Sequence, residues 1–178
     1  MQKRLAGRSH PGSTWSRPIC QRRQYACSLV REPVLVRSAA GYSGTPLPKK
    51  LGIKPGMRVA LLHPPEGIEA TLGALPDGVR LQHGLRRSQR VDLIVGFVTA
   101  RDHLAHNIGW LVTTLPPEGA FWVAWPKRAS KMATDMTENA VREIALPVGW
   151  VDVKVCAIDS RWSGLKLVLR KELRPIGT

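Results

Sequence analysis

The chain of 178 residues contains none of the short motifs that identify the common catalytic sites. There is no G-x-S-x-G nucleophile elbow, no H-E-x-x-H metal-binding helix and no P-loop. Its three cysteines include no C-x-x-C pair and are odd in number, which suits neither a disulfide scaffold nor a paired zinc site. The sequence therefore excludes the best-marked classes of hydrolase, metalloprotease and nucleoside triphosphatase, and it predicts no bound metal and no cofactor.

Long apolar runs are also missing. No segment approaches the roughly 20 apolar residues that a membrane-spanning helix needs, and residues 1–37 lack the apolar core of a secretory signal. With few cysteines and no sign of a membrane partner, the sequence predicts a cytoplasmic protein.

Acidic residues are scarce at the N-terminus. The formal net charge is +14, and residues 1–37 contain eight Lys and Arg but one acid. This segment is rich in Arg and contains Ser, as transit peptides do, but it has no apolar periodicity with which to form a core. We expect residues 1–38 to be a basic, disordered or artefactual extension, residues 39–172 to be one α/β domain, and residues 173–178 to be a tail.

The central segment alternates between strand and helix patterns. The nearly continuous apolar run of residues 91–98 is typical of a strand buried on both faces, which favours a parallel sheet. Two alternating segments near the C-terminus predict an antiparallel hairpin in which Asp152 lies opposite Arg170. The expected fold is a three-layer α/β sandwich with a mostly parallel sheet that ends in this hairpin. The predicted strands are residues 58–62, 79–85, 91–98, 120–125, 151–158 and the hairpin's return strand; the predicted helices are residues 46–51, 67–75 and 101–115, and one capped by Asp135.

Domains of this kind often bind nucleotides or S-adenosylmethionine, yet the loop after the first predicted strand lacks their glycine pattern. Residues 63–67 read His-Pro-Pro-Glu-Gly, and the second predicted strand is not followed by an acidic residue that could hold a ribose hydroxyl. The closing hairpin resembles the end of S-adenosylmethionine-dependent methyltransferases, in which the last strand runs antiparallel. The architecture is therefore expected to be methyltransferase-like (Rossmann-like), without the usual cofactor loop.

Several longer motifs resemble a family of uncharacterised bacterial proteins, the domain of unknown function numbered three-zero-five-two. The resemblance implies a bacterial, cytoplasmic setting and no assigned activity; it covers about residues 40–171, and residues 1–37 lie outside it. The motifs that carry it are Gly-Tyr-Ser-Gly-Thr-Pro-Leu at 41–47, Lys-Lys-Leu-Gly-Ile-Lys-Pro-Gly at 49–56, Trp-Pro-Lys at 125–127, Thr-Asp at 134–135, Val-Asp-Val-Lys-Val-Cys-Ala at 151–157 and Trp-Ser-Gly-Leu-Lys-Leu-Val at 162–168.

Ligands of open α/β sheets bind at the carboxyl ends of the strands. The loop of residues 125–131 combines an aromatic ring, three cations and a hydroxyl, and a second tryptophan lies in the hairpin turn. We expect both tryptophans to line one concavity. His103, His106 and Trp110, by contrast, are predicted to lie on a solvated flank of their helix. The candidate ligand-binding residues are His63, Trp125, Lys127, Ser130, Lys131, Trp162 and Ser163.

These observations favour a non-catalytic binding domain whose partner is an unknown small anionic or aromatic ligand, or a macromolecule. Two alternatives stay open. One is a divergent transferase that uses an unusual cofactor loop. The other is a nucleic-acid-binding module that uses its basic surface.

Overall fold

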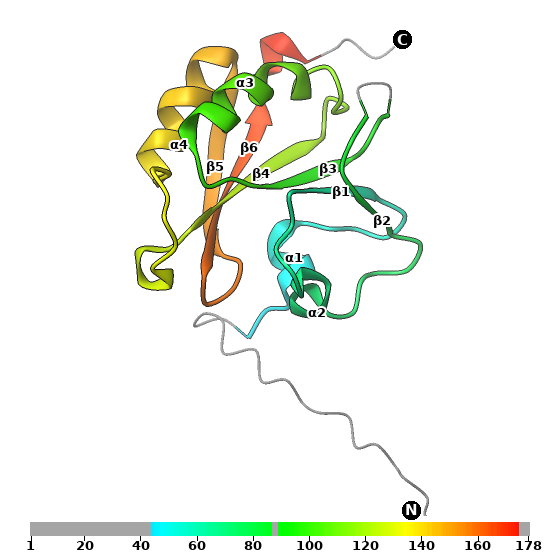
Figure 1. Ribbon diagram of the computed structural model, residues 1–178. Helices are drawn as coiled ribbons and strands as arrows, with labels where there is room; N and C mark the ends of the chain where they lie inside the picture. The colour runs from blue at the N-terminus through cyan, green and yellow to red at the C-terminus, as the bar shows by residue number, and fades with distance from the viewer. Residues whose placement is uncertain (1–43, 87–88, 175–178) are drawn as a thin grey trace, which may run out of the picture. The chain divides into compact units, whose positions relative to one another are not determined.

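The computed structural model describes residues 44–86 and 89–174 (Figure 1). The predicted extension of residues 1–38 and the last four residues of the predicted tail lie outside this part of the chain. Within it, no helix is long and apolar enough to cross a membrane.

One six-stranded sheet organises these residues, in the order β2-β1-β3-β4-β6-β5. Neighbours among β1 to β4 pair in parallel, whereas β6 pairs antiparallel with both β4 and β5. The predicted fold class, a mostly parallel sheet that ends in an antiparallel hairpin, is confirmed. The strands are β1 (Arg58–Leu62), β2 (Arg80–His83), β3 (Leu93–Phe97), β4 (Ala120–Pro126), β5 (Trp150–Ala157) and β6 (Trp162–Leu169).

Helices cover both faces of the sheet and make three layers (Figure 1). The helices α1 (Leu47–Leu51) and α2 (Ile68–Leu72) pack on one face, and α3 (Arg101–Leu111) and α4 (Glu138–Ala145) pack on the other. Short 3-10 turns follow at Arg128–Ser130, Leu146–Val148 and Lys171–Leu173.

Strand β4 separates two apolar cores. All seven of its residues are buried. Because successive side chains point to opposite faces of a sheet, Phe121, Val123 and Trp125 belong to the core under α3 and α4. Trp122 and Ala124 belong to the core under α1 and α2. A strand buried on both faces has the continuous apolar sequence that indicates a parallel sheet.

The start of α4 differs from the prediction. Thr137, not Asp135, is its N-cap, and its hydroxyl accepts a hydrogen bond from the amide of Ala140 at 3.1 Å. The Asp135 carboxylate instead accepts one from the amide of Arg101 at 2.9 Å, at the first residue of α3. Asp135 therefore caps the start of α3 and not that of α4. It can do so because the starts of both helices lie together at this edge of the sheet.

The predicted pairing of Asp152 with Arg170 is wrong. Asp152 lies opposite Leu167, and its carboxylate accepts a hydrogen bond from Nε of Arg142 on α4 at 2.9 Å. The pKa of Arg142 is raised by its hydrogen bonds to Asp152 and then to Glu138. Arg170 instead extends to the carbonyl of Leu146, 3.4 Å away.

Two features of the hairpin displace its register. The amide of Ile158 closes the turn by donating to the carbonyl of Trp162 at 3.0 Å. The Asp159 carboxylate accepts hydrogen bonds from the amides of Arg161 and Trp162. A bulge between Asp152 and Lys154 then inserts one residue. One extra residue moves every later side chain to the opposite face. Asp152 thus lies beside α4, whereas Lys154, on the other side of the bulge, reaches the carbonyl of Lys50 in α1 at 3.4 Å.

Candidate functional site

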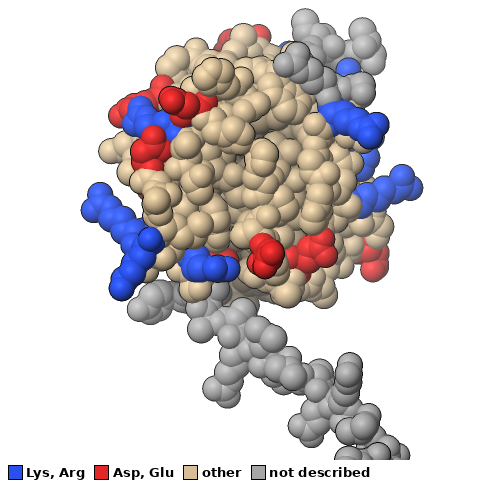
Figure 2. All heavy atoms as spheres, viewed as in Figure 1, with Lys and Arg blue, Asp and Glu red and all other residues tan. Residues whose placement is uncertain are grey.

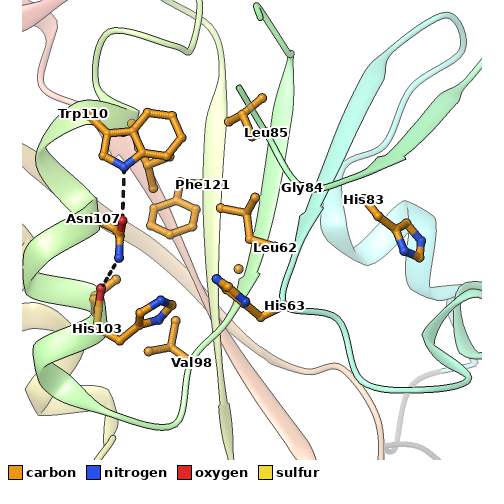
Figure 3. Close-up of a pocket in the computed structure, with 13 residues that line it drawn as sticks. Leu62, His63, His83, Gly84, Leu85, Val98, His103, Asn107, Trp110 and Phe121 are labelled. Carbon is orange, nitrogen blue, oxygen red and sulfur yellow. Dashed lines mark hydrogen bonds between the residues drawn. The ribbon is translucent and has the colours of Figure 1, made fainter. Parts of the chain in front are cut away.

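A pocket of about 500 Å³ lies at the carboxyl ends of β1, β2 and β3, under α3 (Figure 3). This is the edge at which open α/β sheets bind ligands. Its wall is mainly apolar and aromatic, with three imidazoles and one amide. The lining residues are Leu62, His63, His83, Gly84, Leu85, Gly96, Val98, His103, Leu104, Asn107, Trp110, Leu111 and Phe121.

The floor of the pocket depends on a glycine in β3. A Cβ atom at Gly96 would lie 3.0 Å from the ring of Phe121 and 3.9 Å from Cβ of Leu62. The missing side chain therefore lets the Phe121 ring lie against β3 and leaves open space above it. Gly96 pairs with Leu62 across the parallel ladder, so β1 and β3 supply adjacent parts of the same floor.

Helix α3 supplies the opposite wall. The Nδ2 of Asn107 donates to the carbonyl of His103 at 2.8 Å, and the indole Nε1 of Trp110 donates to Oδ1 of Asn107 at 3.4 Å (Figure 3). These contacts join the three residues into one row along the helix. Because the amide and the indole already have partners within the helix, the wall is held in place without a ligand.

His63 and His103 form a pair at one end of the pocket. Their ring centroids are 4.7 Å apart and their planes meet at 71°. His63 follows β1 and has a φ of 50°, in the left-handed region that residues other than glycine rarely adopt. Uncommon backbone conformations of this kind occur most often at functional sites.

His83 is separate from this pair. Its Nε2 lies 2.8 Å from a carboxylate oxygen of Glu69 on α2, and its ring projects from the far side of the pocket in Figure 3. In the described part of the chain, no three His, Cys, Asp or Glu side chains are grouped closely enough to hold a metal ion.

The predicted site around the two tryptophans is not one concavity. Trp125 packs in the core under α3 and α4, whereas Trp162 packs in the other core, with its ring centroid 5.1 Å from that of Phe97. Both lie at the same edge of the sheet, since Trp162 pairs with Pro126. Residues directly opposite each other on paired strands share a face of the sheet. Trp125 lies opposite Ser163, so Trp162, one residue away, points to the other face.

The basic loop after β4 is engaged with the backbone. The ammonium of Lys127 donates to the carbonyl of Asp159 at 2.7 Å, and the Ser130 hydroxyl donates to the carbonyl of Lys127 at 2.6 Å. Lys131 is exposed with a φ of 56°, and Ser163 is half-buried in β6. Of the seven predicted site residues, His63 is the one that lines the pocket.

Sequence reasoning missed most of the pocket. His103, His106 and Trp110 were predicted to lie on a solvated flank of α3. His103 and His106 are exposed, as predicted, whereas Trp110 is half-buried. His103 and Trp110 also line the pocket, which was not predicted. A signal was present: His103, Asn107 and Trp110 recur at i, i+4 and i+7, and so form a second stripe beside the apolar one.

Cys156 lies outside the pocket, half-buried on β5. Burial raises the pKa of its thiol, and the positive charges of Lys154, Lys50 and Lys127 oppose that effect to a smaller extent. Since the thiolate is the reactive form, this thiol is expected to react slowly.

We predict that maleimide labelling of Cys156 has a pH profile displaced to higher pH in the folded protein than in the urea-unfolded chain. The measurement uses a Cys20→Ser/Cys27→Ser background, so that a single thiol reports. Equal rates in the folded and unfolded states at neutral pH would contradict the effect of burial.

Comparison with known proteins identifies no family. No protein-family model matches the chain, and no curated protein sequence matches it. Solved structures with a similar fold include three methyltransferases. One is an S-adenosylmethionine-dependent methyltransferase from Aquifex aeolicus, 13% identical, with a TM-score of 0.48 over 68% of this chain and 87% of that one. A ribosomal protein L11 methylase from Lactobacillus delbrueckii subsp. bulgaricus is 15% identical, with a TM-score of 0.47 over 70% and 75%. Magnesium protoporphyrin IX methyltransferase from Synechocystis is 11% identical, with a TM-score of 0.46 over 69% and 78%.

Proposed function

We propose that this protein is a non-catalytic binding domain that holds a small, mainly apolar or aromatic ligand in the pocket under α3. The observation that carries the proposal is the pocket itself, about 500 Å³ in volume, with an apolar wall and few polar groups. Ligand sites typically have this size and this composition.

The composition of the lining supports binding over catalysis. The described lining residues include no Ser, Thr, Cys, Lys, Asp or Glu, so among them there is no hydroxyl, thiol, amine or carboxylate nucleophile. Its titratable groups are imidazoles, and two of the three belong to the pair His63–His103. A divergent transferase remains the second candidate, because an imidazole in a pocket can move a proton.

A nucleic-acid partner is favoured less at this site. None of the lining residues that the structure describes is Lys or Arg, the side chains that neutralise phosphates. On the face drawn in Figure 2, Lys and Arg side chains lie around the margin and are not gathered into one patch. We therefore propose a small molecule as the partner, in a bacterial cytoplasmic protein of the kind that the sequence motifs resemble.

The test is a fluorescence titration of the full chain with N-phenyl-1-naphthylamine, an uncharged aromatic probe whose emission rises in apolar surroundings. We expect saturable enhancement with one site per chain, unchanged between low and high salt because no ion pair is involved. An enhancement that never saturates would contradict the proposal. Binding of an RNA oligonucleotide that weakens steeply with salt would favour the nucleic-acid alternative instead.

We also predict that S-adenosylmethionine does not bind with micromolar affinity. Cofactor sites in such sheets need close approach of backbone amides after the first strand, and Pro64 and Pro65 have no amide hydrogen to offer. Isothermal titration calorimetry measures this directly. A micromolar dissociation constant would restore the transferase alternative.

A further inference from the structure

We propose that the ligand is an aromatic molecule with a single anionic group, such as a carboxylate or sulfonate, and that His63 and His103 bind this group. The inference rests on the proposed function and adds the charge and polarity of the ligand to it. It uses the two lining imidazoles whose ring nitrogens have no hydrogen-bond partner among the residues that the structure describes.

The division of the pocket into an apolar body and a polar end supports this ligand class. Leu62 and Phe121 face the space between β1 and α3, and the two imidazoles lie together below them in Figure 3, with Val98 beside His103. Among the described residues, neither imidazole has a hydrogen-bond partner, whereas Asn107 and Trp110 are bonded to each other. A centroid separation of 4.7 Å leaves the two rings close enough for one anionic group to lie within reach of both.

The charged groups around the pocket favour an anionic ligand over a cationic one. The described part of the lining contains no carboxylate, so a cationic ligand would lack a counter-ion, whereas a protonated imidazole attracts an anion. The third lining imidazole, His83, already has Glu69 as its partner. The charged residues nearest to the pair along the chain are Glu66, Arg101 and Asp102, and none of these lines the pocket. Two imidazoles without a third ligand make a poor metal site.

The experiment compares two probes with the same aromatic body. N-phenyl-1-naphthylamine is uncharged, and 1-anilinonaphthalene-8-sulfonate carries a sulfonate. Each is titrated against the full chain at pH 5.5 and pH 8.0. We expect the affinity for the sulfonate probe to be about fivefold higher at pH 5.5, as expected for a partly exposed charge pair, and the affinity for the uncharged probe to be unchanged.

Three variants locate the effect. His63→Asn suits the left-handed φ of this position, since Asn tolerates that region, and His103→Gln keeps a polar side chain on α3. Each is expected to remove most of the gain at pH 5.5 while leaving the uncharged probe bound. His106→Gln, on the same helix but outside the lining, is the matched control and should keep the full gain.

The outcomes separate the two proposals. If neither probe saturates, the proposed function fails. If the uncharged probe saturates but the sulfonate probe shows no gain at pH 5.5, the anionic ligand class is overturned and the binding pocket stands. A gain that survives both His63→Asn and His103→Gln would place the anion away from this pair of imidazoles and would also overturn the inference.

Discussion

Replacing Trp122 by alanine is expected to lower the free energy of unfolding by about 3–5 kcal/mol, as removal of a fully buried indole does. Trp122 has no exposed surface and lies in β4 at the centre of the core under α1 and α2. Its indole Nε1 also donates a hydrogen bond to the carbonyl of Leu51, at the end of α1, at 2.9 Å. The one side chain therefore both fills the core and ties α1 to the sheet.

A phenylalanine pair separates these two contributions. Trp122→Phe keeps much of the ring but leaves the Leu51 carbonyl without its donor. Trp150→Phe is the matched control: Trp150 has no exposed surface, and its Nε1 has no partner among the described residues. We expect Trp122→Phe to be less stable than Trp150→Phe by about 1–2 kcal/mol, the cost of an unsatisfied buried carbonyl.

Urea denaturation followed by circular dichroism measures all three variants. If Trp122→Phe and Trp150→Phe unfold at the same urea concentration, the bond between Trp122 and Leu51 contributes nothing measurable. A loss well under 2 kcal/mol for Trp122→Ala would mean that the core closes over the missing indole.

The elements themselves could be predicted because their signals are local. Strand β1 matches its predicted bounds, and β3 and β4 lie within one or two residues of theirs, since an uninterrupted apolar run marks a strand buried on both faces. Helix α3 starts at the predicted residue, although Thr113 and Thr114 at its end form turns instead of continuing the helix.

Register could not be predicted, because it depends on details that alternation does not encode. The hairpin turn is closed by the carboxylate of Asp159, and the bulge after Asp152 inserts one residue into β5. Either change displaces the pairs, and the bulge also exchanges the faces. The same limit applies to Trp125 and Trp162. Only the observed register, in which Trp162 pairs with Pro126, shows that the two side chains lie on opposite faces of the sheet.

The predicted site lies after β4 and in the hairpin turn, whereas the pocket lies at the ends of β1, β2 and β3, at the same edge of the sheet. The charged and aromatic residues after β4 predicted a ligand site there, because side chains of these types bind ligands and are recognisable in a sequence. The pocket instead depends on an absent side chain at Gly96 and on half-buried leucines, which have no distinctive sequence pattern. His63 was identified because it follows a strand and adjoins two prolines; His103 was not, because its helical stripe was assigned to solvent.

Filling the pocket should abolish ligand binding without unfolding the protein. Leu62 is half-buried at the end of β1 and faces the cavity opposite α3 (Figure 3). An indole at this position has open space to occupy, so Leu62→Trp avoids most of the overpacking cost of a filled core. We expect the affinity for N-phenyl-1-naphthylamine to fall by more than tenfold, which corresponds to more than about 1.4 kcal/mol of binding free energy.

The control for this variant lies on the neighbouring strand. Leu81 is also half-buried, but it packs against the core under α1 and α2, on the opposite face of the sheet. Leu81→Trp therefore adds the same volume away from the pocket and should bind the probe with unchanged affinity. Melting temperatures of both variants, measured by circular dichroism, show whether each remains folded. A folded Leu62→Trp that binds the probe as tightly as the unmodified chain would mean that the probe occupies another surface, and the pocket under α3 would lose its assignment as the binding site.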